Sequence, residues 1–253
     1  MQKWIVVPLY NESLRFDTEY WNQIVSMANC SFLFANDGST DNTGNLIDGF
    51  TEANVEVLHF SKNAGKAETI RKSFKFILDG GQSNTKFIGY LDADRAFDPL
   101  EVVSIINDST KSFQLESLDA IWMSRVKLGG SQVERSPFRH FFGRVIASYI
   151  GIGISKFPYD TQCGFKIFKA TSDLSSILDE PFETKWFVDI EIMNRLSSKM
   201  NKWMNIDEVP LNYWKEIGNS KIGWHSILRV LFEIFTVKKR LIQVERVVRN
   251  GLT

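Results

Sequence analysis

The first half of the chain alternates short apolar runs with segments of helical spacing, and this alternation constrains the fold most. Apolar runs of strand length occupy residues 4–8, 32–35, 55–60, 87–91 and 118–123. Residues 20–28 and 64–78 have helical spacing. Near-continuous apolar strands that alternate with helices predict a Rossmann-like α/β fold, in which helices cover both faces of a mostly parallel central sheet.

The second half has longer helical segments and fewer strands. Helical spacing is found at 137–154, 187–196 and 223–248, and strand patterns are found at 165–168 and 204–213. Pro210 lies in the last of these strands, which is typical of a sheet edge because proline cannot donate to a neighbouring strand. The helix over 223–248 is amphipathic. No linker rich in Pro, Gly or Ser divides the chain, so we expect a single domain over residues 1–253.

Charge and cysteine content exclude several classes of protein. Lys plus Arg and Asp plus Glu both number 30, which argues against nucleic-acid binding through a broad positive field. Two cysteines are too few for a disulfide framework. The amino-terminal apolar run lacks the pattern of a signal peptide, and no run of 18 apolar residues occurs. We therefore expect a cytoplasmic protein, with the cytoplasmic face of a membrane as a second, peripheral location.

The sharpest chemical motif is the pair Asp92 and Asp94, directly after the apolar run at 87–91. Ligands of parallel α/β sheets bind beyond the carboxyl ends of the strands. Two carboxylates at such an end can hold a divalent cation, which in turn holds a diphosphate. An isolated pair of this kind is more often a solvated turn, but its position after a buried strand favours the cation site.

Two further motifs follow predicted strands. Asp37 lies in the sequence NDGSTD at 36–41, where it can accept hydrogen bonds from a base or a ribose, or else cap the next helix. Lys66 ends the sequence KNAGK at 62–66, where it can meet a phosphate, or else simply begin a solvated helix. Both alternatives remain open at the level of the sequence.

Taken in order, the motifs VPLYNE at 7–12, NDGSTD, KNAGK and LDAD at 91–94 resemble those of family 2 glycosyltransferases, which are inverting enzymes with the GT-A fold. Three later motifs are similar to the dolichyl-phosphate β-glucosyltransferase branch, and less so to dolichyl-phosphate mannose synthases. They are DTQCGFK at 160–166, WFVDIE at 186–191 and GNSK at 218–221. The resemblance covers about residues 3 to 235.

The resemblance implies roles for individual residues. The donor, UDP-glucose first and GDP-mannose second, would be bound by Pro8, Tyr10, Glu12, Asp37, Lys66, Asp92, Gln162 and Gly164. Asp92 and Asp94 would hold Mg²⁺ or Mn²⁺, and Arg125 would bind the sugar and phosphates. Asp189 would reach the substrate, whereas Glu191 would not, because positions i and i+2 face different sides of a helix. Residues 1–125 would form the half that binds the nucleotide sugar, and residues 126–253 the half that binds the acceptor.

The acceptor implied by the resemblance is a polyprenyl or dolichyl phosphate at a membrane surface. Arg135, Arg139 and Arg144 alternate with apolar residues at helical spacing, which suits an anionic phosphate on a hydrocarbon tail. Alternatively, that helix buries its apolar stripe in the core. The last helix, with Lys238 and Arg240, would lie on a membrane, on the domain or on another subunit.

Two other functions stay open. A glycosyltransferase with a soluble or cell-surface saccharide acceptor would need a carboxylate such as Asp189 to take the proton of the hydroxyl, whereas a lipid phosphate is already anionic. A non-catalytic protein that binds nucleotide sugars is the other alternative. Relatives often carry Gln or a small residue two positions after the second Asp, whereas here Asp94 is followed by Arg95, Ala96 and Phe97. The metal site would then have one protein ligand fewer, or Arg95 would instead neutralise a phosphate.

Overall fold

A computed structural model describes residues 3–80, 84–217 and 224–250, without the side chains at 110–116, 139 and 224–227. In chain order its elements are β1 (Lys3–Leu9), α1 (Thr18–Met27), β2 (Ser31–Asn36), α2 (Thr43–Asp48), β3 (Val55–His59), α3 (Lys66–Asp79), β4 (Phe87–Leu91), α4 (Pro99–Glu116), β5 (Ala120–Ser124), β6 (Gln132–Glu134), α5 (Pro137–Gly151), β7 (Phe165–Lys169), α6 (Ser172–Ile177), α7 (Val188–Met200), β8 (Ile206–Pro210), β9 (Tyr213–Lys215) and α8 (Trp224–Asn250).

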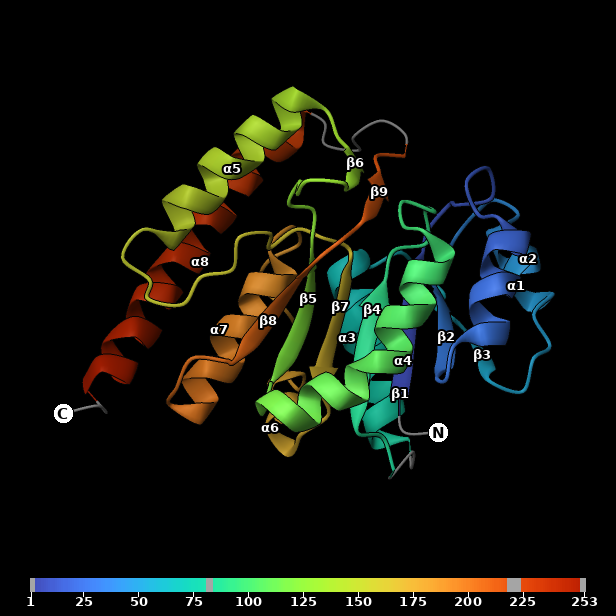
Figure 1. The fold of residues 1–253 in the computed structure, drawn as a ribbon, viewed down its shortest axis with the longest axis horizontal. Helices are drawn as coiled ribbons and strands as arrows, with labels where there is room; N and C mark the ends of the chain where they lie inside the picture. Colours follow the sequence, from blue (N-terminus) through green and yellow to red (C-terminus); the bar gives the residue numbers. More distant parts are fainter. Residues whose placement is uncertain (1–2, 81–83, 218–223, 251–253) are drawn as a thin grey trace.

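Within the described residues, the main sheet has seven strands in the order β3-β2-β1-β4-β7-β5-β8. All neighbours are parallel except β7, which runs antiparallel to both β4 and β5. The predicted α/β class is therefore confirmed, and β8, which contains Pro210, lies at the sheet edge as expected. Strands from both halves of the chain build this one sheet (Figure 1).

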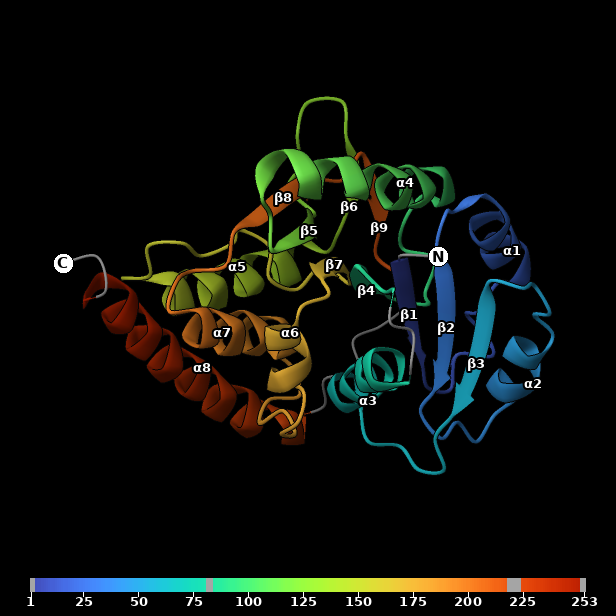
Figure 2. The ribbon, with the colours of Figure 1, turned by 90° about the horizontal axis from the view of Figure 1, so that it is seen from below.

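The sheet is buried on both faces because apolar residues occupy both sides of each central strand. In β1, Ile5 and Val7 belong to one core cluster, whereas Trp4 and Val6 belong to the other. Helices α1, α2 and α4 contribute to the first cluster, and α3, α6, α7 and α8 contribute to the second. Figure 2 shows α4 on one side of the sheet, with α3 and α6 on the opposite side.

The apolar pattern predicts one strand over 204–213, but the structure divides it into β8 and β9. β8 pairs with β5, and β9 pairs with β6 in a small second sheet. At this division, the carboxylate of Glu101 accepts hydrogen bonds from the backbone N–H groups of Asn212 and Tyr213, at 2.7 and 3.0 Å.

Elements α4, β6 and α6 were not predicted from the sequence, whereas α2 is the helix expected after the motif at 36–41. The start of α4 has a recognisable signal: Asp98 caps the helix by accepting the Glu101 N–H at 2.9 Å, and Pro99 is the first helical residue. Apolar periodicity alone did not reveal this helix.

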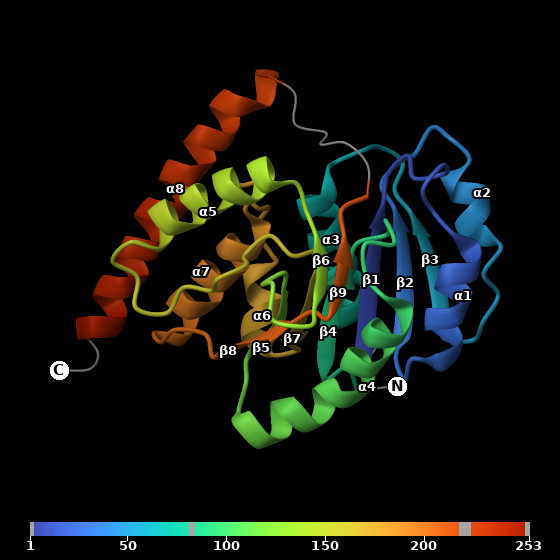
Figure 3. The same cartoon turned by 45° about the horizontal axis from the view of Figure 1, so that its top comes forward.

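The helices expected at 137–154 and 223–248 are observed as α5 and α8. They lie side by side at one end of the molecule, beyond α7 (Figure 3). Only part of each helix faces the core, where Ile150 and Ile234 are buried. The remaining apolar side chains on both helices are described with the site.

Candidate active site

The carboxyl ends of β1, β2 and β4 meet at one edge of the sheet, as the order of the motifs predicts. Hydrogen bonds join the loops that leave these strands. The Asn11 N–H donates to Ser39 Oγ at 3.0 Å, and the Glu12 N–H donates to Thr43 Oγ1 at 2.8 Å. The motifs at 7–12 and 36–41 therefore form one continuous rim beside β4.

Asp37 fixes a third loop to this rim. Its two carboxylate oxygens accept the backbone N–H groups of Ala64 and Gly65 at 2.9 and 2.8 Å, and the residue is 2% exposed. Gly38 has φ +67°, and a Cβ there would lie 2.7 Å from the Asn63 nitrogen, so the turn requires glycine. Asp37 thus positions the start of α3, and its contact with a base remains a prediction.

Asp92 and Asp94 lie just beyond β4. Burial, together with the neighbouring charge of Asp92, raises the pKa of Asp94 to about 6. Within the described ranges, no group of three or more His, Cys, Asp or Glu residues is arranged to hold a metal. Two carboxylates nevertheless fit Mg²⁺ or Mn²⁺, because such ions commonly take one or two protein carboxylates and fill the other positions with phosphate oxygens and water.

Lys66 is the first residue of α3 and forms an ion pair with Asp92, with 2.5 Å between Nζ and Oδ1. Its ammonium also lies 5.2 Å from the centre of the Tyr90 ring. Burial would lower the pKa of Lys66, but the charges of Asp92 and Asp189 outweigh that effect and raise it. Lys66 therefore stays charged at the predicted cation site.

Gly164 packs directly on the other side of Asp92. The Asp92 N–H donates to the Gly164 carbonyl at 2.8 Å, and a Cβ on Gly164 would lie 2.0 Å from Asp92 Oδ2. The antiparallel pairing of β7 with β4 creates this approach, since Leu91 is opposite Phe165. The motif at 160–166 thus joins the same strand ends.

Arg125 and Asp160 form a buried, bidentate ion pair beside this region. Arg125 donates from Nε and Nη2 to the two Asp160 oxygens, both at 2.7 Å, and its backbone N–H donates to Oδ2 at 2.9 Å. Burial would raise the pKa of Asp160, but the hydrogen bonds and charge of Arg125 hold it well below its usual range. Arg125 also lies 5.0 Å from the centre of the Trp214 ring.

Asp160→Asn should destabilise the protein by about 3 kcal/mol, because it leaves the Arg125 charge buried without its partner. Urea unfolding followed by circular dichroism measures the change. Asp179→Asn is the matched control, since Asp179 forms an exposed pair with Lys75. Equal and small losses for both variants would contradict the structural importance of the Arg125–Asp160 pair.

Asp189 is the second residue of α7 and lies in a buried polar cluster. It accepts a hydrogen bond from the Tyr90 hydroxyl, and its Oδ2 lies 3.5 Å from Nζ of the fully buried Lys166. Glu191 points elsewhere and accepts the backbone N–H of Thr184 at 2.9 Å. The two carboxylates thus diverge, as their spacing predicts.

The other residues expected to bind the donor lie around the same rim. Tyr10 is exposed and Pro8 is half-buried at the end of β1. Glu12 forms an ion pair with Arg15. Gln162 is exposed, and its backbone N–H donates to Asp160 at 3.1 Å. Their contacts with a nucleotide sugar remain predictions.

Arg95 forms an ion pair with Asp17, and its contact with a phosphate remains a prediction. It has φ +58°, and its Nη1 donates to Asp17 Oδ2 at 2.7 Å. Asp17 is the capping residue of α1 and also accepts the Tyr20 N–H at 3.1 Å. Arg95 therefore ties the loop after Asp94 to the start of α1.

The basic residues assigned to the acceptor lie at the start of α5 and along it. Arg135 donates to the Arg125 carbonyl at 3.1 Å. Arg144 donates to the Tyr159 carbonyl at 2.5 Å, and its guanidinium lies 3.8 Å from the centre of the Tyr159 ring. The side chain of Arg139 and the motif at 218–221 lie outside the described residues. The acceptor role of these arginines remains a prediction.

Helices α5 and α8 present a continuous set of exposed apolar side chains, here called the aromatic face. Phe138 on α5 is 70% exposed, and Phe232 on α8 is 72% exposed. The other members are Phe141, Phe142, Val145 and Tyr149 on α5, Ile152 directly after α5, and Leu228, Leu231 and Phe235 on α8. Tyr149 packs edge-on against Phe235, with 6.3 Å between ring centres, so the two helices form one surface. The alternative that the α5 stripe is wholly buried is wrong for these residues.

None of the described helices is both long enough and apolar enough to cross a bilayer. The exposed side chains of the aromatic face lie on the amphipathic helices α5 and α8 and next to them. Exposed apolar patches of this kind are typical of surfaces that contact a protein or a membrane.

The fold and the family are both supported by comparison with known proteins. A crystal structure of glucosyl-3-phosphoglycerate synthase from Mycobacterium tuberculosis, in complex with Mn²⁺, UDP and glucosyl-3-phosphoglycerate, superposes with a TM-score of 0.56 over 96% of this chain and 78% of that chain, at 14% identity. The protein thus has the GT-A glycosyltransferase fold. Residues 4–159 match the family described as glycosyl transferase family 2, and the chain belongs to that family.

Curated relatives extend the similarity beyond the matched domain. A dolichyl-phosphate beta-glucosyltransferase of Trichomonas vaginalis is 28% identical over 92% of this chain and 69% of the relative. The enzyme of the same description from Saccharomyces cerevisiae is 27% identical over 87% and 68%. A polyprenol monophosphomannose synthase of Mycolicibacterium smegmatis is 24% identical over 97% and 91%.

Tyr90 and Lys166 belong to the site but were not among the predicted site residues. Tyr90 lies inside an apolar strand, where nothing in the local pattern distinguishes it from a core residue. Lys166 offers a signal, because a lysine within the short apolar strand β7 requires a partner when it is buried. That partner is Asp189, contributed from a helix that follows β7 in the chain.

Proposed function

We propose that this protein is an inverting glycosyltransferase that moves a hexose from a nucleotide diphosphate sugar to a polyprenyl phosphate. Glucose is the first choice of hexose and mannose the second, with UDP-glucose and GDP-mannose as the corresponding donors. The main support for a nucleotide diphosphate sugar as donor is the pair Asp92 and Asp94 at the end of β4, with Lys66 and Arg125 close by. The similarity to dolichyl-phosphate beta-glucosyltransferases and a polyprenol monophosphomannose synthase supports the acceptor class.

Asp92 and Asp94 are the residues that would hold Mg²⁺ or Mn²⁺. When bound, the ion neutralises the charge that builds up on the departing nucleoside diphosphate. Arg125, whose guanidinium is fixed by Asp160, and Lys66 supply further positive charge at the same strand ends. Because these groups are fixed before substrate binds, little reorganisation is needed during the reaction.

The surroundings of Asp189 support an acceptor that is already anionic. One of its oxygens accepts the Tyr90 hydroxyl, and the other faces the Lys166 ammonium. Because both of its oxygens already have partners within the protein, Asp189 is poorly placed to take the proton of a sugar hydroxyl. A phosphate oxygen needs no base to attack the anomeric carbon, whereas a sugar hydroxyl does.

The aromatic face supports a location at a membrane surface, where a polyprenyl phosphate is found. Basic residues border this face: Arg144 lies half-buried on α5, and Lys238 on α8 donates to the Ile150 carbonyl at 3.0 Å. Exposed aromatic residues flanked by cations suit an interface in which tails lie beside anionic head groups. We propose that α5 and α8 rest on an anionic lipid surface.

Replacing Phe138 and Phe232 together by serine should weaken binding to anionic phospholipid vesicles about tenfold or more, because each phenylalanine would lose apolar contact with the lipid. Vesicle co-sedimentation measures the change. Phe76→Ser is the matched control, since Phe76 is exposed on α3, away from this face. An equal loss in control and double variant, or none in either, would contradict the lipid contact.

The test of the function is transfer of label from UDP-[¹⁴C]glucose or GDP-[¹⁴C]mannose to polyprenyl phosphate, with Mn²⁺ present. We expect label in the lipid phase with one of the two donors. Label that enters only water-soluble products would favour a saccharide acceptor instead. Calorimetric binding of UDP-glucose without any product would favour a non-catalytic binding protein.

A further inference from the structure

Lys66 places a positive charge from the chain itself at the acidic end of β4. Its Nζ lies 2.5 Å from Asp92 Oδ1, and the charges of Asp92, Asp189 and Asp94 all act on it. A divalent cation held by Asp92 and Asp94 would occupy the same small region. Two positive charges at such short range repel each other strongly, so the ammonium and a free cation compete.

Contacts of the preceding residue, Gly65, fix the position of the Lys66 backbone. Gly65, immediately before it, has φ +91° and is held by its N–H bond to Asp37 at 2.8 Å. The backbone of Lys66 is therefore anchored to the end of β2, while its side chain reaches the end of β4. The side chain is 43% exposed, so part of it faces solvent.

We propose that Lys66 is a resident counter-ion that keeps free divalent cation out of the donor-free site. Its ammonium neutralises the pair Asp92 and Asp94 until a diphosphate arrives. The phosphate oxygens then attract the ammonium away from Asp92. The cation and the nucleotide are therefore taken up together. This role rests on the proposed nucleotide-sugar donor.

The experiment measures Mn²⁺ binding to the full chain by electron paramagnetic resonance, first without nucleotide and then with UDP. Without nucleotide, Lys66→Met and Lys66→Gln should bind Mn²⁺ about tenfold or more tightly than the unaltered protein, because the competing charge is gone. Lys66→Arg should bind as weakly as the unaltered protein. UDP should improve Mn²⁺ binding more in the unaltered protein than in Lys66→Met.

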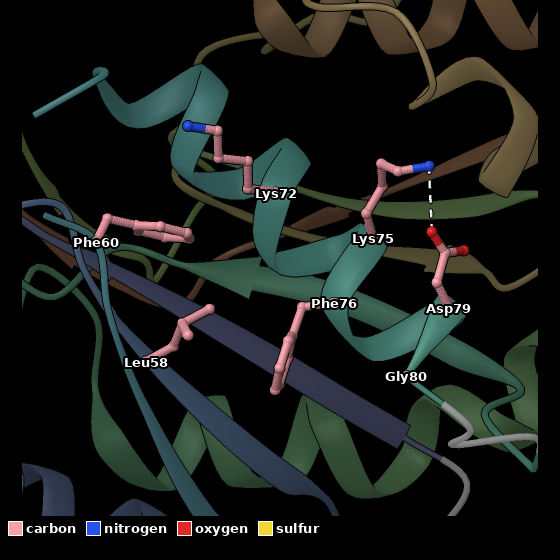
Figure 4. Close-up of a pocket in the computed structure, with 7 residues that line it drawn as sticks. All are labelled: Leu58, Phe60, Lys72, Lys75, Phe76, Asp79 and Gly80. Carbon is pink, nitrogen blue, oxygen red and sulfur yellow. Dashed lines mark ion pairs between the residues drawn. The ribbon is translucent and has the colours of Figure 1, made fainter. Parts of the chain in front are cut away.

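Lys72→Met is the matched control, because it removes a lysine from the same helix at a distance from the acidic pair. The Lys72 ammonium lies 5.6 Å from the centre of the Phe60 ring, beside a shallow hollow of about 440 Å³ between β3 and α3 (Figure 4). Its Mn²⁺ binding should not change. Circular dichroism verifies that each variant is folded.

Two results would overturn the proposal: neutral variants at Lys66 that bind Mn²⁺ no more tightly than the unaltered protein, or Lys66→Arg that binds as tightly as Lys66→Met. These readouts do not depend on sugar transfer. If binding tightens as expected but no hexose is transferred to any acceptor, the proposed function fails and the counter-ion role stands. If hexose is transferred but the neutral Lys66 variants bind Mn²⁺ no more tightly, the counter-ion role fails and the proposed function stands.

Discussion

Asp94→Ala should lower metal-dependent turnover of the nucleotide sugar by about a thousandfold or more. Asp94 is one of the two carboxylates predicted to hold the cation, and burial, together with the neighbouring charge of Asp92, raises its pKa to about 6. Without the cation that Asp94 would help to hold, the charge on the departing diphosphate is less stabilised, and the activation free energy is expected to rise by several kcal/mol. Each 1.36 kcal/mol corresponds to about a factor of ten in rate. Donor hydrolysis and transfer assays over a Mn²⁺ titration measure the effect.

Asp108→Asn is the control for Asp94→Ala. Asp108 is an exposed carboxylate on α4, remote from the end of β4. Its removal tests whether loss of one negative charge anywhere on the protein affects turnover. Unchanged metal-dependent turnover in Asp94→Ala would end the assignment of a cation site at this strand end.

Gly164→Ala should reduce turnover by about a hundredfold. A Cβ at this position would lie 2.0 Å from Asp92 Oδ2, so the carboxylate must move away from its present place. Displacing a positioned group by about 1 Å commonly costs that factor in rate. Because Asp92 also holds Lys66, the substitution should disturb the ion pair as well. Single-turnover kinetics with the labelled donor measures the change.

Gly129→Ala is the matched control, since a Cβ on that glycine would have no atom within 4 Å and its φ is not in the left-handed region. Thermal unfolding of both variants separates a displaced carboxylate from a protein that has lost its fold. If Gly164→Ala keeps full activity, the close packing of Gly164 on Asp92 has no functional consequence.

Local sequence patterns were enough to predict the parallel strands and the acidic pair. Each buried strand is a short apolar run, and the polar residue that follows it marks its carboxyl end. The positions of Asp37 and Asp92 directly after buried strands were predictable for this reason. The partners of Asp37 were not, because its bonds to Ala64 and Gly65 depend on how the loop after β3 returns to β2.

Contacts that depend on β7 could not be predicted. Nothing in the pattern at 165–168 indicates that this strand is inserted between β4 and β5, or that it runs against them. The approach of Gly164 to Asp92 and the burial of Lys166 between Tyr90 and Trp122 both follow from that insertion. The burial of α5 was likewise undecidable, because an amphipathic pattern does not specify which partner covers its apolar side.

The central position of β7 has a consequence for how the protein is synthesised. When the ribosome has released the chain only as far as Ser124, β4 and β5 lack the strand that must lie between them. Their facing edges stay without hydrogen-bond partners until Lys169 has emerged, and open edges of this kind favour pairing between molecules. A split or truncated version of the protein is therefore best divided outside residues 87–169, so that one fragment retains β4, β5 and β7 together.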